Sequence, residues 1–174
     1  MTDIDRLLQG ADTIVPEEEF RERIAEGKPL RVKLGMDPTA PTVTLGWAVV
    51  LRKLRHFQEQ GHKAVLIVGD FTAQVGDPSG KSETRKRLSE EEVRGFAENV
   101  LDGFKKVLIW EDDLLEVRYN SEWLSELDMA DVLELTSKMT LAQMLERDDF
   151  SKRFQANQPI SMMEFMYPLL QGMD

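Results

Sequence analysis

The sequence predicts an α/β fold built on a parallel sheet, and three observations support this prediction. Residues 31–87 contain two short apolar, β-branched runs. Each run ends in a polar loop that contains glycine, and one amphipathic segment separates the two runs. This order of strand, loop, helix, strand and loop is typical of the first half of a nucleotide-binding α/β domain.

Length and composition limit the class of protein. The 174 residues suffice for one domain, or for one domain and part of another. A net charge of −10 argues against a broad nucleic-acid surface, although Lys81, Arg85, Lys86 and Arg87 form a local basic cluster. The absence of cysteine excludes a disulfide framework and fits a cytoplasmic protein. The first residues do not resemble a signal peptide, and no run approaches the roughly 20 apolar residues of a membrane span.

The first third of the chain predicts two helices and a strand. A helix is expected over residues 3–8, and a second helix starts at Pro16, whose acidic followers suit the positive end of a helix dipole. The second helix should end near residues 27–29, before a strand over 30–36. The two prolines of residues 37–41 then require a loop at the carboxyl end of that strand.

The next elements complete the strand–helix–strand unit. Apolar residues recur at helical spacing over residues 45–60, and Gly61 is a natural stop. The continuous apolar run at 64–69 predicts a strand that is buried on both faces. Ligands of such sheets bind beyond the carboxyl ends of the strands, where Asp37 and residues 70–80 lie.

The remaining chain is expected to be mainly helical. Capping boxes at Ser89 and Ser161 predict helices over 89–104 and 162–171, the latter with Pro168 inside it. A third strand is expected over 114–119. Helices are also expected over 121–127, over 129–135, and from 140–145 through the charged residues up to 153.

The loop from Gly76 to Ser82 has two interpretations. Three residues separate its glycines, whereas a Walker A loop needs four. Its free backbone N–H groups and Lys81 could still bind an anion. The alternative is a surface turn with solvated charges, which the spacing alone favours.

Other candidate residues also leave alternatives open. Asp37 and Asp77 could face one pocket that holds an ammonium group or a metal, or they could cap loop N–H groups. His56 and His62 lack partners at metal-ligand spacing and are expected at the surface, so no metal site is predicted. The apolar run from Met162 to Met173 predicts a core or subunit-interface helix, or less readily a pocket wall.

Several stretches of the sequence resemble a known family. The stretch LGMDPTAPTVTLGW through VGDFTAQVGDPSGKSETR, with LEVRYNSEWL, LTSKMTLAQMLERDDF and PISMMEFMYPLLQGMD, resembles the catalytic domain of bacterial tyrosyl-tRNA synthetases. The resemblance implies a class I, Rossmann-like (HUP-type) parallel sheet with flanking helices. It also implies ATP-dependent activation of tyrosine, followed by transfer of tyrosine to tRNA.

The resemblance assigns roles to individual residues. Asp77, Tyr167 and Gln171 would bind the tyrosine ammonium group, Asp174 its phenol hydroxyl, and Thr72 and Asn120 would line the same pocket. Gly35, Asp37 and Thr39 would lie along the adenylate, and Lys81 and Arg85 would cover the reacting phosphates. ATP would bring Mg²⁺, and no tightly bound cofactor is expected.

The chain departs from the family at one motif. The usual His-x-Gly-His signature reads Thr44-Leu45-Gly46-Trp47. Gly46 would still let adenine approach the backbone, whereas Thr44 lacks an imidazole and Trp47 would place an indole where ATP should lie. Because loss of one transition-state donor typically costs about 10²–10³ in rate, impaired activity is expected.

The resemblance also implies a domain division. Residues 1–29 would form an N-terminal helical segment, residues 30–109 the first half of the nucleotide-binding domain, and residues 110–174 a connective segment. Homodimerisation is expected through residues 110–166. The second half with its Lys-Met-Ser-Lys-Ser loop and the tRNA-binding domains are expected to be absent, so tRNA is not expected to bind. The alternative function is a non-catalytic or engineered descendant that binds a small molecule or a protein through a remodelled apolar pocket.

Overall fold

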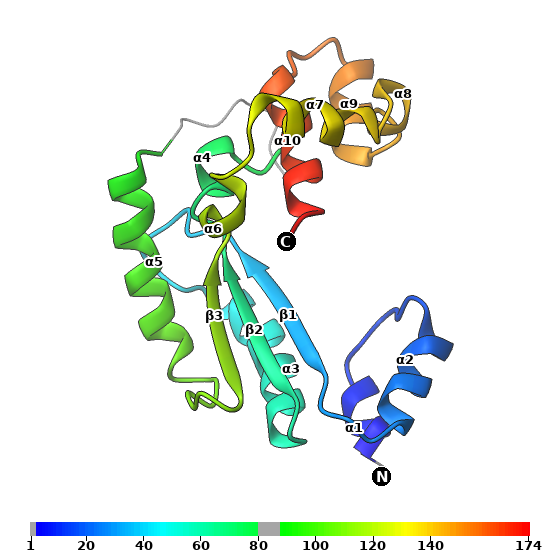
Figure 1. Cartoon of the computed structure of the whole chain (residues 1–174), viewed down its shortest axis with the longest axis vertical. Coiled ribbons are helices and arrows are strands. Elements are labelled where there is room, and N and C mark those ends of the chain that lie inside the picture. Colours follow the sequence, from blue (N-terminus) through cyan, green and yellow to red (C-terminus); the bar gives the residue numbers. More distant parts are fainter. Residues whose placement is uncertain (1–2, 80–87) are drawn as a thin grey trace. The chain divides into compact units, whose positions relative to one another are not determined.

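A three-stranded parallel sheet organises the structure. The computed structural model describes residues 3–79 and 88–174. The strands are β1 (Arg31–Met36), β2 (Lys63–Val68) and β3 (Leu115–Tyr119), in the order β1-β2-β3. They run side by side in one direction (Figure 1), which confirms the predicted α/β fold class.

Ten helices accompany the strands in the described residues. They are α1 (Asp3–Leu8), α2 (Glu17–Ala25), α3 (Leu45–Glu59), α4 (Thr72–Val75), α5 (Glu90–Phe104), α6 (Ser121–Leu124), α7 (Met129–Ser137), α8 (Leu141–Met144), α9 (Asp148–Gln155) and α10 (Met162–Gln171). No helix among them is both long and apolar enough to cross a membrane.

Three helices differ from the predictions. Helix α4 was expected to be loop, because its four residues are too few to show a helical period. Helix α6 ends at Leu124 rather than at residue 127. The single helix expected from 140 to 153 is divided into α8 and α9, because Arg147 adopts an extended backbone between them.

The chain forms two compact units that alternate along the sequence. The first comprises Met1–Leu34, Ala40–Ile67 and Glu98–Arg118, and the second Gly35–Thr39, Val68–Ala97 and Tyr119–Asp174. Each strand begins in the first unit and ends in the second. The segments that directly follow β1, β2 and β3 therefore all begin in the second unit. The three-part sequential division remains a prediction.

The core of the first unit surrounds β2. Ala64, Val65, Leu66 and Ile67 are all buried, which confirms that the strand is covered on both faces. Helix α3 contributes Leu51, Leu54 and Phe57 to this core. The buried Gln58 of α3 donates to the carbonyls of Ile109 and Leu114 and accepts from the Ile109 N–H, so it satisfies the backbone of the turn before β3.

His62 corrects one prediction. The residue was expected at the surface, but it is only 8% exposed and its Nδ1 accepts a hydrogen bond from the Leu30 N–H at 3.1 Å. Burial lowers the pKa of His62. His56 is half-buried rather than fully exposed. His62 is therefore a neutral acceptor that ties the start of β2 to the start of β1.

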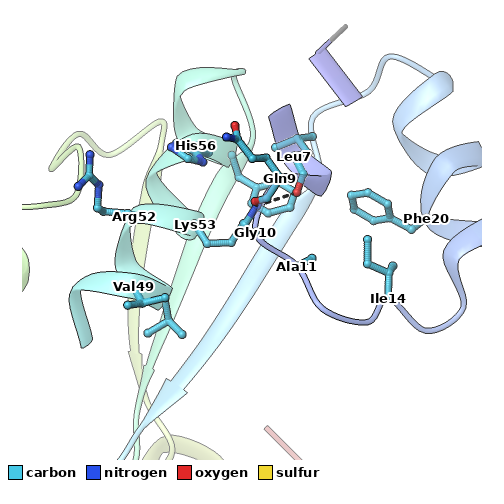
Figure 2. A pocket seen from close by; sticks show the side chains of 12 residues that line it. Leu7, Gln9, Gly10, Ala11, Ile14, Phe20, Val49, Arg52, Lys53 and His56 are labelled. Carbon is cyan, nitrogen blue, oxygen red and sulfur yellow. Dashed lines mark hydrogen bonds between the residues drawn. The ribbon is translucent and has the colours of Figure 1, made fainter. Parts of the chain in front are cut away.

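An apolar cavity of about 400 Å³ lies between the N-terminal segments and α3 of the first unit. Figure 2 shows Phe20 and Ile14 on one side, and Val49 and Lys53 of α3 on the other. Lys53 donates to the carbonyls of Leu7 and Gln9, which lie at the end of α1 and just beyond it. The lysine stem thus crosses apolar surface while the ammonium caps a helix terminus.

The second unit is mainly helical, and several of its helices begin at capping boxes. Asp128, Thr140 and Ser161 close capping boxes at the starts of α7, α8 and α10. The predicted capping boxes at Ser89 and Ser161 are both confirmed. Helix α10 packs against α4 and α7 and continues past Pro168 to Gln171. These contacts position one face of α10 beside the segment that follows β2.

Candidate functional site

Asp37 is the centre of a hydrogen-bonded cluster in the second unit. The residue directly follows β1, and its Oδ1 accepts a hydrogen bond from the Thr72 hydroxyl at 2.7 Å. Its Oδ2 accepts from the Tyr167 hydroxyl at 2.8 Å. Thr72 begins α4 and Tyr167 lies on α10, so the cluster joins three segments that are distant in sequence.

Asn120 extends this cluster from the end of β3. Its Oδ1 accepts a hydrogen bond from the Phe71 N–H at 3.0 Å. Its Nδ2 donates to the Thr72 Oγ1 at 2.9 Å and to the Asp174 Oδ2 at 3.3 Å. Asn120 is fully buried and Thr72 is 2% exposed, so these polar groups depend on one another rather than on solvent.

Gly69 provides the space in which Asp37 and Thr72 meet. A Cβ atom at this position would lie 1.9 Å from the Asp37 Oδ1 and 2.4 Å from the Thr72 Oγ1. The backbone cannot easily move away, because the Gly69 N–H donates to the Met36 carbonyl at 2.8 Å. Only glycine is therefore compatible with this close approach.

The cluster raises the pKa of two of its members. Burial raises the pKa of Asp37 to about 6, against the opposing effect of the hydrogen bonds from Thr72 and Tyr167. Burial and the Asp37 carboxylate raise the pKa of Tyr167 above its usual range. The charges of Asp77 and Asp174 act in the same direction on both groups. Three carboxylates thus impose a negative potential on one small region.

For Asp77 the structure confirms the loop-capping interpretation, and its role in an ammonium pocket remains a prediction. Its Oδ1 accepts a hydrogen bond from the Ser79 N–H at 2.8 Å, which confirms the loop-capping role. Its charge also raises the pKa of Asp37, so the two carboxylates act on one another. Among the described residues, no group of three or more potential ligand side chains could hold a metal ion.

Three further predicted residues lie beside this cluster in the sequence. Gly35 is the fifth residue of β1, and the Thr39 N–H donates to the Asp37 carbonyl at 2.9 Å. Gln171 is the exposed last residue of α10, one turn after Tyr167. Lys81 and Arg85 lie outside the described residues.

The altered signature belongs to the first unit. Thr44 immediately precedes α3, and its side chain makes no capping hydrogen bond. The Trp47 ring packs against Phe104 of α5, with ring centroids 5.5 Å apart and planes inclined by 50°. At Gly46 a Cβ atom would lie 3.6 Å from the Thr44 Oγ1, which is an ordinary contact. The roles predicted for these three residues remain predictions.

Sequence reasoning missed Gly69, Asp70 and Ser121. The two oxygens of Asp70 accept hydrogen bonds from the N–H and the hydroxyl of Ser121, at 2.9 and 2.7 Å. Asp70 and Ser121 could have been found from their positions, because each lies two residues after the end of a strand, β2 and β3, and these strands are adjacent and parallel.

Comparison with known proteins supports a synthetase fold. A tyrosyl-tRNA synthetase from Archaeoglobus fulgidus, solved with L-tyrosine, matches 99% of this chain with a TM-score of 0.76 and 22% identity. The mitochondrial tyrosyl-tRNA synthetase of Coccidioides posadasii matches 97% of it with a TM-score of 0.75 and 25% identity. The chain covers 51% and 49% of those two structures. This chain therefore has the fold of these synthetases.

The sequence comparisons identify the family. The family described as tRNA synthetases class I (W and Y) matches residues 25–174. Tyrosine–tRNA ligases of Deinococcus radiodurans and Moorella thermoacetica are each 53% identical over 98% and 97% of this chain. The chain belongs to this class I family, and its curated relatives here are tyrosine–tRNA ligases. It spans about two fifths of the length of these relatives, 42% and 41% respectively.

Proposed function

We propose that this chain forms the tyrosine-binding part of a tyrosine–tRNA ligase catalytic domain. The observation that carries the proposal is the cluster of Asp37, Thr72, Asn120 and Tyr167, which assembles residues from the ends of all three strands and from α10. The relatives are tyrosine–tRNA ligases, and this supplies the substrate, tyrosine.

The cluster has the chemistry to bind an ammonium group. Because the Tyr167 hydroxyl donates its hydrogen to Asp37, its oxygen keeps lone pairs that can accept a hydrogen bond from a ligand. The carboxylates of Asp37, Asp77 and Asp174 add a negative potential that favours a cation. We assign the ammonium group to Tyr167, Asp77 and Gln171, and the phenol hydroxyl of the ligand to Asp174.

The proposed reaction needs positioning more than covalent chemistry. An oxygen of the tyrosine carboxylate attacks the α-phosphorus of ATP, and pyrophosphate leaves. Gly35, Asp37 and Thr39 would lie along the adenylate, and Mg²⁺ would enter with the phosphates. Since Thr44 and Trp47 replace both signature histidines, we propose that this chain alone binds ATP poorly and does not charge tRNA.

Titration calorimetry of the purified chain tests the proposal. We expect tyrosine to bind without ATP and expect ATP alone to give no measurable heat of binding. Phenylalanine is the matched control ligand, because it lacks only the hydroxyl assigned to Asp174 and should bind at least tenfold more weakly. Failure of tyrosine to bind would overturn the proposed function, and measurable aminoacylation by this chain would overturn the predicted impairment.

Restoring the signature tests the cause of the impairment. The double variant Thr44→His and Trp47→His should improve ATP binding if the altered signature limits it. Unchanged ATP binding would show instead that segments of the longer relatives are limiting. Tyrosine binding should be the same in both proteins and serves as the internal control.

We further propose that the second unit mediates homodimerisation. Five of its apolar side chains are between 60% and 78% exposed: Met129, Leu133, Leu141, Phe154 and Met162. Exposed apolar surface of this kind on neighbouring helices is typical of subunit interfaces. Sedimentation should give twice the chain mass of 20.0 kDa, and Leu133→Lys should shift it towards the monomer. A wild-type monomer at all concentrations would contradict the proposal.

The second candidate function is a non-catalytic protein that keeps this fold. Thr44 and Trp47 are the observations that favour it, because neither side chain can supply the charge of an imidazole. Binding of neither tyrosine nor ATP in the same titrations would support this candidate. The exposed apolar helices of the second unit would then be the place to search for a protein partner.

A further inference from the structure

Two residues without an assigned role connect the ends of β2 and β3. We propose that Asp70 and Ser121 are positioning residues, which act as a clamp that fixes Asn120 and Thr72 for tyrosine binding. This inference rests on the proposed function, because it concerns the same cluster. It assigns no contact between the clamp and the ligand.

The clamp has the geometry of a strong hydrogen-bonded pair. The Asp70 Oδ1 accepts from the Ser121 N–H at 2.9 Å, and its Oδ2 accepts from the Ser121 hydroxyl at 2.7 Å. Hydrogen bonds to an ionised carboxylate are shorter and stronger than those between neutral groups. Both residues are half-buried, so competition from water is reduced.

The clamp flanks the backbone on which the cluster depends. Phe71 and Thr72 directly follow Asp70, and Asn120 directly precedes Ser121. The Asn120 N–H and the Asp70 N–H both donate to the Val68 carbonyl at 2.9 Å. Closing Asp70 onto Ser121 therefore holds the Phe71 N–H and the Asn120 amide at hydrogen-bonding distance.

The orientation of the Asn120 amide determines the direction of the hydrogen bonds that run from Asn120 through Thr72 to Asp37. Because the Asn120 carbonyl oxygen accepts from Phe71, its NH₂ group must face Thr72. The Thr72 oxygen accepts that hydrogen bond, so its own hydrogen is directed at Asp37. The Tyr167 hydroxyl donates to the other oxygen of Asp37 and presents an acceptor to the ligand. A displaced Asn120 side chain would therefore disturb the hydrogen bonds that Thr72 and Tyr167 donate to Asp37.

A double-mutant cycle on the tyrosine dissociation constant tests the inference. Asp70→Ala should raise the dissociation constant about tenfold, and Ser121→Ala, which keeps the backbone hydrogen bond, about threefold. Asp70→Asn retains an acceptor for the Ser121 N–H and should rescue most of the loss. In an Asn120→Ala background, Asp70→Ala should cause no further loss, because its effect passes through Asn120.

The matched control is Asp128→Ala. Like Asp70, Asp128 accepts two hydrogen bonds, here both from backbone N–H groups, of Ala130 and Asp131, but it caps α7 and lies outside the cluster. This variant should lower the melting temperature and leave the tyrosine dissociation constant unchanged. If Asp70→Ala does not fold, the cycle is carried out with Ser121→Ala.

A second measurement separates the inference from the proposed function. The side-chain amide resonances of Asn120 in ¹H–¹⁵N spectra of the ligand-free chain should shift in Asp70→Ala and stay in place in Asp128→Ala. Additive losses in the cycle, or unshifted Asn120 resonances, would overturn the inference even if tyrosine binds. Absence of binding by the wild-type chain would overturn the proposed function, and with it the purpose of the clamp, whatever the spectra show.

Discussion

Both side-chain oxygens of Asp37 accept hydrogen bonds from side-chain hydroxyls. Thr72 and Tyr167 stabilise its ionised form, yet burial outweighs them and raises its pKa to about 6. Folding therefore favours the protonated form of this group. At neutral pH the site holds a carboxylate at an energetic cost, which a cationic ligand can reduce.

The pH dependence of unfolding should report this cost. Because the folded pKa of Asp37 is raised, its stabilising contribution is complete below about pH 4 and is lost as the pH rises through 6. In the wild-type chain, Asp37 should lower the unfolding free energy by about 2 kcal/mol between pH 4.5 and pH 7.5, and Asp37→Asn should abolish this part of the pH dependence. Urea unfolding of the wild-type chain and the variant at both pH values measures the change. Because the pKa of His62 is lowered, its effect on the unfolding free energy increases as the pH rises, but this effect is the same in the wild-type chain and in Asp37→Asn.

The close packing at Gly69 leads to a second prediction for a single residue. Gly69→Ala should lower the unfolding free energy by about 1–3 kcal/mol and weaken tyrosine binding, because its methyl group would overlap Asp37 and Thr72. Gly95→Ala is the matched control, since nothing lies within 4 Å of a Cβ on that exposed residue of α5. The control should gain about 0.5–1 kcal/mol. Equal effects of the two substitutions would contradict the close packing at Gly69.

Among the elements, α10 depends on a buried ion pair. Arg153 of α9 is 5% exposed and donates two hydrogen bonds to Glu164, which is 6% exposed, and one to the Pro159 carbonyl. Glu164 also accepts from the Ser161 N–H at the start of α10. The pair therefore connects α9 to the helix that carries Tyr167 and Gln171.

Breaking this pair should destabilise the chain strongly. Glu164→Gln keeps the capping geometry but leaves the Arg153 charge uncompensated, so a loss of about 3 kcal/mol of unfolding free energy is expected. Thermal or urea unfolding measures it. Glu134→Gln breaks the exposed pair between Glu134 of α7 and Lys138, which caps the end of that helix, and should leave the unfolding free energy unchanged within error. Similar losses in both variants would mean that helix charge, rather than burial, determines the effect.

At the scale of the whole molecule, the elements with strong patterns were predictable. The unbroken apolar run of β2 and the helical spacing of Leu51, Leu54 and Phe57 in α3 each have one physical explanation. Helix α4 and the break between α8 and α9 were missed because tertiary packing and single backbone angles decide such short segments.

The candidate site was predictable only in part. Strand order brings Asp37, Thr72 and Asn120 to one edge of the sheet, and the resemblance to a known family pointed to Tyr167. Asp70 and Ser121, for which we propose a role through their neighbours, were missed. Asp70 and Ser121 can pair only because β2 and β3 are adjacent, and the order of strands in the sheet cannot be read from the sequence alone. His62 was misjudged because its partner, the Leu30 N–H, belongs to the backbone.

In the part of the chain that the structure describes, β1 lies at the edge of the three-stranded sheet, and this position has a consequence for handling this chain. The outer backbone groups of an edge strand can pair with a strand of another chain, which is a common route to aggregation. Lys33 is exposed on β1, whereas the charge of Arg31 is paired with Glu116 at 2.9 Å, so two copies aligned along this edge would bring their Lys33 side chains together. Solubility during concentration or refolding should therefore depend on Lys33, and it should fall at high ionic strength, where the repulsion between the two Lys33 charges is screened.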